Sequence, residues 1–335
     1  MRQGNQGAPA ATPARFGRLL HLGNVVVDIV LAVPALPERG GDVLASRAEA
    51  APGGGCNVMA AAARQGLLAA YAGAHGTGPF GTLARAALAA EGIDIIQPVK
   101  AGQDTGFVLT MVEASGERTF LTSPGAEATL TDADLGRVRP AARDAVYLSG
   151  YSLVHDSNRA ALLGWLGRLG DGQTMFFDPG PLAGSIPPRA LAAVLDRADW
   201  LTCNAREAAT LAGVTDPRAA AAVLAGRTGR SRVLVRTGQD GCLIGRPGAG
   251  VVHVPGFQVR VVDTNGAGDT HSGVFIAALA AGAAETAAAR TANAAAALSV
   301  TRHGPATAPT REELARFLTT ARERRTVLAP RPETA

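Results

Sequence analysis

A glycine-rich turn between two aspartates carries the strongest chemical signal in the sequence: Asp263-Thr264-Asn265-Gly266-Ala267-Gly268-Asp269. A strand-like run at 257–262 precedes the turn, and an apolar helical run at 273–279 follows it. The small residues 266–268 allow backbone N–H groups to converge at a helix N-terminus, which suits an anion such as a transferring phosphoryl group. Asp269 would then accept a proton from an incoming hydroxyl. A purely structural turn, with Asp269 favouring the helix dipole, is the alternative.

A second glycine-rich segment, Pro52-Gly53-Gly54-Gly55-Cys56-Asn57, opens an alanine-rich helical stretch near the start of the chain. With both segments present in this order, the sequence resembles the ribokinase-like family, also called PfkB carbohydrate kinases, over residues 21–311. The resemblance implies ATP-dependent phosphorylation of a hydroxyl on a small sugar-like substrate, with Mg²⁺ and Asp269 as base. Residues Gly266, Ala267 and Gly268 would form the anion-binding turn.

The resemblance also implies a substrate site. Asp28 matches the sugar-binding aspartate, and its carboxylate would accept bonds from two neighbouring hydroxyls. Gly53, Gly54 and Asn57 match the loop that faces the sugar, although two residues, not three, separate the glycine pair from the asparagine. Arg118, on a predicted hairpin, could reach the substrate, or could simply be solvated.

Further motifs match the nucleotide and cation sites of that family. Asn204 and Glu207 form an N-x-x-E motif associated with magnesium and phosphate placement, although they could equally form a helix capping box. The segment with Thr237, Gly238 and Gly241 would run along the nucleotide, and Asn293 would lie near the adenine. The resemblance also implies a monovalent-cation site for K⁺, formed by five residues: Asp263, Asn265, Ser299, Arg302 and Gly304.

Elements that position these residues alternate along the chain. Strands are expected at 18–27, 67–74, 145–149, 174–178, 200–203 and 232–236, with helices between them. This alternation predicts an α/β fold with a doubly wound, mostly parallel sheet. Segments 30–52 and 98–123 interrupt it with Val, Thr, Gly and Pro, and 114–117 has hairpin chemistry. We read both as a small β flap, or lid, within a kinase domain at 18–322, between a flexible leader at 1–17 and a disordered tail at 323–335.

Composition narrows the remaining choices. The net charge is +4, and the arginines are scattered, so a nucleic-acid partner is not expected. No signal peptide is apparent, and the most apolar stretch, 273–284, is too short to cross a bilayer. Three widely spaced cysteines show no metal-ligand spacing. We therefore expect a cytoplasmic enzyme with a small-molecule substrate.

Alternative functions differ in their motifs. The P-loop spacing is absent, and no G-x-G-x-x-G follows the first strand, which argues against a dinucleotide-dependent oxidoreductase. A nucleoside kinase of the same fold remains the main alternative, although the scarcity of tyrosine and tryptophan favours a free sugar. Exposed strand edges and apolar residues in the flap predict a homodimer formed through the lid, because unpaired edges are usually covered. The alternative is that the apolar face closes over the protein's own sugar site.

Overall fold

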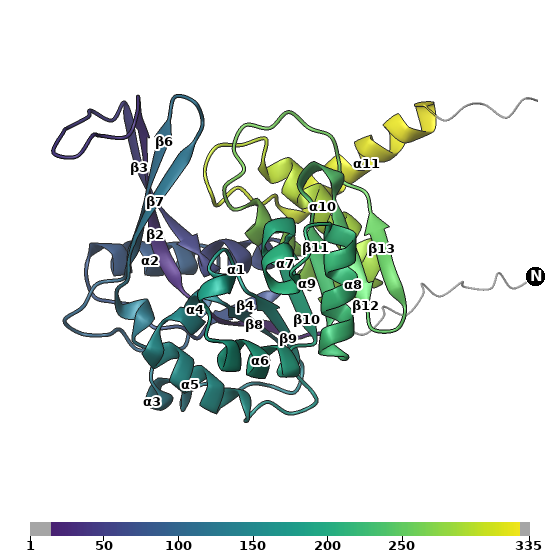
Figure 1. Ribbon diagram of the computed structural model, residues 1–335, viewed down its shortest axis with the longest axis horizontal. Coiled ribbons are helices and arrows are strands. Elements are labelled where there is room, and N and C mark those ends of the chain that lie inside the picture. Colours follow the sequence, from purple (N-terminus) through teal and green to yellow (C-terminus); the bar gives the residue numbers. More distant parts are fainter. Residues whose placement is uncertain (1–14, 329–335) are drawn as a thin grey trace, which may run out of the picture.

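A nine-stranded sheet forms the centre of the structure, a computed structural model that describes residues 15–328, with side chains described as far as residue 321 (Figure 1). Its strand order is β13-β12-β11-β10-β9-β8-β1-β4-β5, parallel from β11 to β5 and antiparallel at β12 and β13. The strands are β1 (Arg18–Leu22), β4 (Leu68–Tyr71), β5 (Asp94–Ile95), β8 (Asp144–Ser149), β9 (Thr174–Asp178), β10 (Trp200–Asn204), β11 (Arg232–Arg236), β12 (Cys242–Arg246) and β13 (Gly250–Val254).

Helices cover both faces of this sheet, as its buried apolar strands require. One core layer lies under α1 (Gly55–Arg64), α2 (Pro79–Ala90), α9 (Ala267–Ala280), α10 (Glu285–Ser299) and α11 (Arg311–Leu328). The other lies under α3 (Asp132–Leu135), α4 (Tyr151–Val154), α5 (Asp156–Leu166), α6 (Pro188–Arg197), α7 (Ala205–Ala212) and α8 (Pro217–Thr228). Short 3₁₀ turns are η1 (Ala126–Ala128), η2 (Ala183–Ser185) and η3 (Gly238–Asp240). The predicted doubly wound α/β fold is confirmed.

A second, four-stranded sheet stands above one end of the first and forms the predicted lid, in the order β3-β2-β6-β7 (Figure 1). Its strands are β2 (Val25–Val33), β3 (Arg47–Gly54), β6 (Phe107–Glu113) and β7 (Arg118–Ser123). The β6–β7 hairpin turns where the sequence predicts, closed by a bond from the Glu113 amide to the Glu117 carbonyl. Alternation along these strands places Val26, Asp28, Val108 and Thr110 toward the body of the protein.

Several predicted boundaries were wrong. The run 18–27 is not one strand, because the chain passes from β1 to β2 at residues 23–24 and so changes sheets. Residues 257–262 form no strand, since no neighbouring strand pairs with them. Phe16 is buried and packs edge-to-face on Phe176, so the predicted leader is anchored at its end. Helix α11 continues to Leu328, into the predicted tail. The rest of the leader, 1–14, and of the tail, 329–335, lies outside the described residues.

No helix within residues 15–328 is both long enough and apolar enough to span a membrane.

Candidate active site

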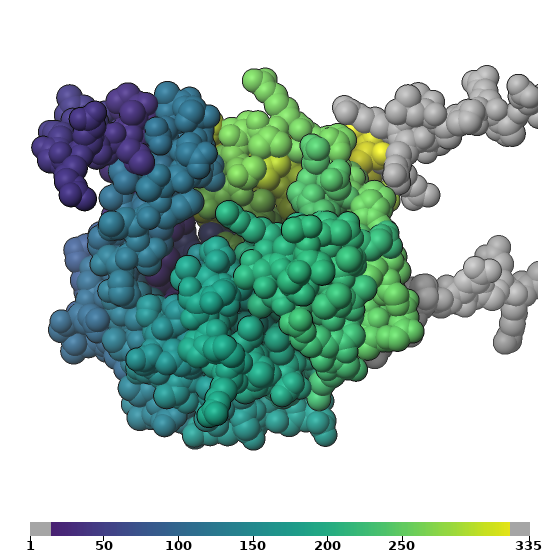
Figure 2. Space-filling view, viewed as in Figure 1, coloured from purple at the N-terminus to yellow at the C-terminus, as the bar shows by residue number. Residues whose placement is uncertain are grey.

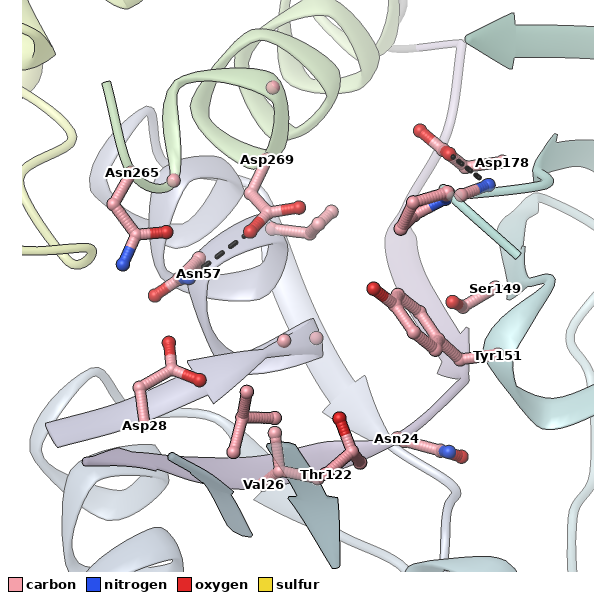
Figure 3. A pocket seen from close by; sticks show the side chains of 18 of the residues that line it. Asn24, Val26, Asp28, Asn57, Thr122, Ser149, Tyr151, Asp178, Asn265 and Asp269 are labelled. Atoms are coloured by element: carbon pink, nitrogen blue, oxygen red, sulfur yellow. Dashed lines mark hydrogen bonds between the residues drawn. The ribbon is translucent and has the colours of Figure 1, made fainter. Parts of the chain in front are cut away.

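A cavity of about 440 Å³ lies between the lid and the carboxyl ends of the parallel strands. Figure 2 shows the hollow between the lid and the body from outside, and Figure 3 shows the side chains within it. Parallel α/β sheets commonly bind ligands at this edge, because the loops that follow the strands converge there. The lining combines carboxylates, amides and hydroxyls from both sheets, among them Asn24, Asp28, Asn57, Thr110, Thr122, Ser149, Tyr151, Asp178, Asn265 and Asp269.

The glycine-rich turn forms the N-terminus of α9 at the edge of this cavity. Gly266 precedes the helix with a φ of 70°, and a side chain there would also collide with the carbonyl oxygen of Pro305. Both constraints require glycine. Within the described chain, the backbone N–H groups of Gly268 and Asp269 donate to no carbonyl or side chain. Two amide donors therefore remain free at a helix N-terminus, as an anion-binding turn needs.

Asp269 lies in the first turn of α9, where its carboxylate accepts a 3.1 Å hydrogen bond from the Asn57 amide of α1 (Figure 3). Burial raises the pKa of Asp269 to about 7; the Asn57 bond opposes this rise, and nearby Asp178 adds to it. A carboxyl group with a pKa near neutrality is suited to accept a proton in general base catalysis.

Asp28 faces the same cavity from the middle of β2, on the lid, and not from the end of the first strand. Burial raises its pKa to about 6. Gly53, on the neighbouring strand, does not line the cavity itself. A side chain at Gly53 would collide with the Asp28 carboxylate, so this glycine provides the space that Asp28 occupies. Gly54 and Asn57 do line the cavity.

A buried ionic network lines the cavity near the carboxyl ends of β9 and β11. Arg236, the last residue of β11, donates a 3.0 Å hydrogen bond to Asp178, the last residue of β9. Its guanidinium also lies 3.7 Å from the Glu207 carboxylate. Asp178 accepts a further hydrogen bond from Thr202. The network thus joins residues from β9, β10, β11 and α7 at one point.

Asn204 and Glu207 form the capping box that the sequence left open as an alternative. The Asn204 side chain accepts a 2.9 Å bond from the Glu207 amide, and the Glu207 carboxylate accepts a 2.8 Å bond from the Asn204 amide. Among the described residues, no three His, Cys, Asp or Glu side chains cluster as a metal site. Magnesium needs few protein ligands, since waters and phosphates supply the rest. The two residues line the cavity and fit such a water-mediated role.

Arg118 does not reach the substrate cavity, which corrects that prediction. Its guanidinium instead donates a 2.7 Å hydrogen bond to Asp263, so the lid hairpin is tied to the loop before α9. A long charged side chain near a hairpin turn pairs with the nearest carboxylate, and the spacing of residues in the sequence does not show which carboxylate that is.

The residues predicted to contact the nucleotide differ in their accessibility in the structure. Asn293 is buried, and its amide donates to the carbonyl oxygens of Val254 and Pro255 while its oxygen lies 2.9 Å from His271. It is therefore not available to the nucleotide. Gly241 packs against residues 254–256, where a side chain would collide with backbone. Thr237 and Gly238 remain at the turn, and a side chain added at Gly238 would meet no atom of the described residues within 4 Å.

The predicted potassium site stays a prediction. Segments 263–265 and 299–304 do lie together, since the Gly304 amide donates to Asp263, and Asn265 also lines the cavity. Two oxygens of the predicted site also accept hydrogen bonds from side chains. The Asp263 carboxylate accepts from Arg118, and the Ser299 carbonyl accepts from Thr307. Arg302 is paired with Glu313.

Sequence reasoning did not assign the cavity residues Asn24, Ser149, Tyr151 and Thr122 (Figure 3). Their residue types are common in turns and strands, so they carry no signal before the two sheets are brought together. Arg236 did have a sequence signal, because it is a charged residue that directly follows the buried apolar run 233–235.

Comparison with known proteins agrees with this geometry. Residues 18–312 match the family described as pfkB family carbohydrate kinase. An uncharacterized sugar kinase of Escherichia coli (strain K12), YegV, is 34% identical over 301 residues, covering 88% of this chain and 91% of that protein. An ATP-dependent ribose-1-phosphate kinase of Halopiger xanaduensis is 32% identical, covering 90% and 98%. The crystal structure of ribokinase from Thermotoga maritima superposes with a TM-score of 0.75 at 26% identity, covering 91% and 99%.

The fold and the site define an α/β kinase with a lid, and the match extends over most of the chain. The protein belongs to the pfkB family of carbohydrate kinases.

Proposed function

We propose that this protein transfers the γ-phosphoryl group of ATP to a hydroxyl of a small, uncharged sugar, with Asp269 as the catalytic base. The observation that carries the proposal is the pairing of a buried carboxyl of raised pKa with two free backbone amides in one helical turn. The carboxylate can take a hydroxyl proton where the amides hold the phosphoryl group that is being transferred.

The reaction follows from this arrangement. The substrate hydroxyl oxygen attacks the γ-phosphorus and its proton passes to the Asp269 carboxylate. The bond from the γ-phosphorus to the bridging oxygen breaks, and its electron pair leaves with ADP. Asp28 and Asn57 hold the sugar, and the lid excludes water that would otherwise accept the phosphoryl group. Magnesium, when bound, neutralises phosphate charge, and Asn204 and Glu207 are the residues that would hold its waters.

The nucleotide is proposed to extend past Gly238 toward a second cavity of about 640 Å³. This cavity adjoins the turn, since the Gly256 amide donates to the Asp240 carbonyl. Its lining includes the Phe257 ring, with the Arg290 guanidinium 5.5 Å from the ring centroid. An aromatic ring and an arginine are suited to stack on a purine base.

An uncharged sugar is favoured by the charges in the first cavity. Asp28, Glu127, Asp178, Glu207 and Asp269 all line it, and the arginine that lines it is already paired with Asp178 and Glu207. A sugar phosphate or sugar acid would add further negative charge beside these carboxylates. Hydroxyl groups can instead donate to Asp28 and exchange bonds with Thr110, Thr122 and Ser149.

Assembly and location are further parts of the proposal. Residues Val108, Thr110 and Phe120 line the protein's own cavity, in line with the alternative that the apolar face of the flap closes over the protein's own sugar site. The opposite lid face carries Leu109 paired with Leu121, and Leu121 is 56% exposed. We propose that this outer face forms a homodimer. All three cysteines are free and buried, consistent with cytoplasmic residence.

An ADP-release assay tests the function. D-ribose, D-fructose, other free sugars, ribose 1-phosphate, a keto-deoxy acid and nucleosides are offered with Mg·ATP. We expect release with a free sugar, reduced roughly 10²–10⁴-fold in Asp269→Asn, which keeps the shape but removes the base. Preference for the phosphorylated or acidic sugars would overturn the substrate class, and preference for nucleosides would establish the alternative. Near-native turnover of Asp269→Asn would overturn the base.

A further inference from the structure

Arg236 carries a charge into the cavity that the mechanism above does not use. It ends β11, its side chain is 13% exposed, and it lines the cavity. Among the described lining residues it is the one arginine or lysine. The histidines there are uncharged near neutral pH, since burial lowers the pKa of His21 to about 3 and also lowers that of His155. Arg236 is therefore the permanent cation of this site.

Most of the donor groups of Arg236 remain free. A guanidinium has five N–H donors. Nη1 uses its two donors for Asp178 and Ser272, each at 3.0 Å. Nη2 lies 3.7 Å from Glu207, an ion pair too long for a hydrogen bond. In the described part of the chain, neither Nε nor Nη2 donates a hydrogen bond to any group.

These free donors lie against the anion-binding turn. A methyl group added at Gly268 would lie 3.6 Å from Nε and 3.8 Å from Nη2 of Arg236. The guanidinium therefore faces the side of Gly268 that lacks a side chain, at the first turn of α9, where the Gly268 and Asp269 amides are also free. The hydrogen bonds from Nη1 to Asp178 and Ser272 fix the orientation of the guanidinium plane. The edge that carries Nε and Nη2 is therefore held in position before a ligand binds.

We propose that Arg236 is a catalytic residue that donates from Nε and Nη2 to the oxygens of the γ-phosphoryl group as it moves from ATP to the sugar. The inference rests on the proposed function. The bonds made and broken remain those of the mechanism above: the hydroxyl oxygen joins phosphorus, the bridging oxygen leaves with ADP, and the proton goes to Asp269. Arg236 keeps its own protons throughout.

The physical reason is the charge of the site. In phosphoryl transfer, negative charge spreads over the equatorial oxygens, and stabilising that charge is most of the catalysis. Here five carboxyl groups, those of Asp28, Glu127, Asp178, Glu207 and Asp269, face the same cavity and oppose an incoming triphosphate. A guanidinium held by two of them offsets their repulsion and presents two directed donors, which a lysine ammonium in the same place cannot do.

Binding of nucleotides tests the contact without any sugar. Calorimetry compares Mg·AMP-PNP with Mg·ADP, which differ in the γ-phosphoryl group. For Arg236→Lys we expect AMP-PNP affinity to fall about tenfold or more while ADP affinity changes less than about threefold. Arg232→Lys is the matched control, because Arg232 begins the same strand and pairs with Glu285 at the surface. Equal losses for both nucleotides would overturn the proposal, since a purely structural arginine would affect them alike.

A crystal structure of the wild type with Mg·AMP-PNP tests the same contact without a variant. We expect Nε or Nη2 within hydrogen-bond distance, about 3 Å, of a γ-phosphoryl oxygen. A guanidinium that contacts no phosphoryl oxygen would overturn the proposal even if Arg236→Lys does not fold. A wild type that releases no ADP with any acceptor in the panel would instead count against the kinase function. An active wild type beside a fully active Arg236→Lys counts against this inference alone.

Discussion

Asn57 and Asp269, 212 positions apart in the chain, meet at a 3.1 Å hydrogen bond in which the amide donates to the carboxylate. The bond joins the first residues of α1 to the first turn of α9, and so places the proposed sugar-facing loop directly beside the proposed base. Each of these helices begins at a glycine-rich segment, and the two pack against each other in the core.

The pH dependence of the wild type follows from Asp269. Its pKa is raised to about 7, and only the ionised carboxylate accepts a proton. We therefore expect kcat/KM, which reports the free enzyme, to rise with pH below about 7 and to level off above it. A profile that is flat from pH 5.5 to pH 8, in a range where the fold is intact by circular dichroism, would contradict the assignment.

Two substitutions should move this profile in opposite directions. Asn57→Ala removes a donor that stabilises the carboxylate, so the apparent pKa should rise. Asp28→Asn removes a nearby negative charge, so the apparent pKa should fall. Steady-state kinetics across pH measures both midpoints. Shifts in the same direction would show that the profile belongs to another group.

The space beside Asp28 should govern sugar affinity. A side chain at Gly53 collides with the Asp28 carboxylate, so Gly53→Ala should displace it and raise the sugar KM about tenfold, as should Asp28→Ala. ATP affinity should hold in both. Gly226→Ala is the control, since Gly226 lies in α8 with no atom near its missing side chain. Weakened ATP binding with unchanged sugar KM would place Asp28 elsewhere in the mechanism.

The ion pair of Arg118 with Asp263 should help to hold the lid closed. Both side chains are partly exposed, at 31% and 19%, so the pair contributes at most about 1 kcal/mol. We expect Arg118→Ala to raise the sugar KM up to about fivefold, an effect that weakens in high salt because the wild-type pair is screened. Arg47→Ala is the matched control, because Arg47 pairs with Glu49 within the lid. An equal effect of both variants would exclude the tie to the body.

The outer lid face should control assembly. A charge at Leu121 would be buried if this face forms a dimer, so Leu121→Asp should give a monomer by light scattering at tens of micromolar. Leu68→Asp, at an exposed leucine of β4 outside the lid, should leave the assembly unchanged. A monomeric wild type would rule out the dimer, and a dimeric Leu121→Asp would place the interface elsewhere.

Local sequence patterns were sufficient to predict the family, the doubly wound sheet and the lid hairpin, and they also place a glycine-rich turn before Asp269. These features depend on local patterns: apolar runs for buried strands, turn residues at 114–117, and small residues before Asp269. A glycine at 266 is required by the backbone of a single turn, so the signal is complete within a few residues.

Tertiary structure alone decided which charged side chains meet. Arg118 pairs with Asp263, the buried Asn293 side chain bonds to backbone carbonyls, and Arg236 pairs with Asp178 and Glu207 in the wall of the cavity. The chain also changes sheets at residues 23–24, which carries Asp28 onto the lid. Such pairings depend on distances between strands and helices far apart in sequence, and long polar side chains bind the nearest partner that the packed fold supplies.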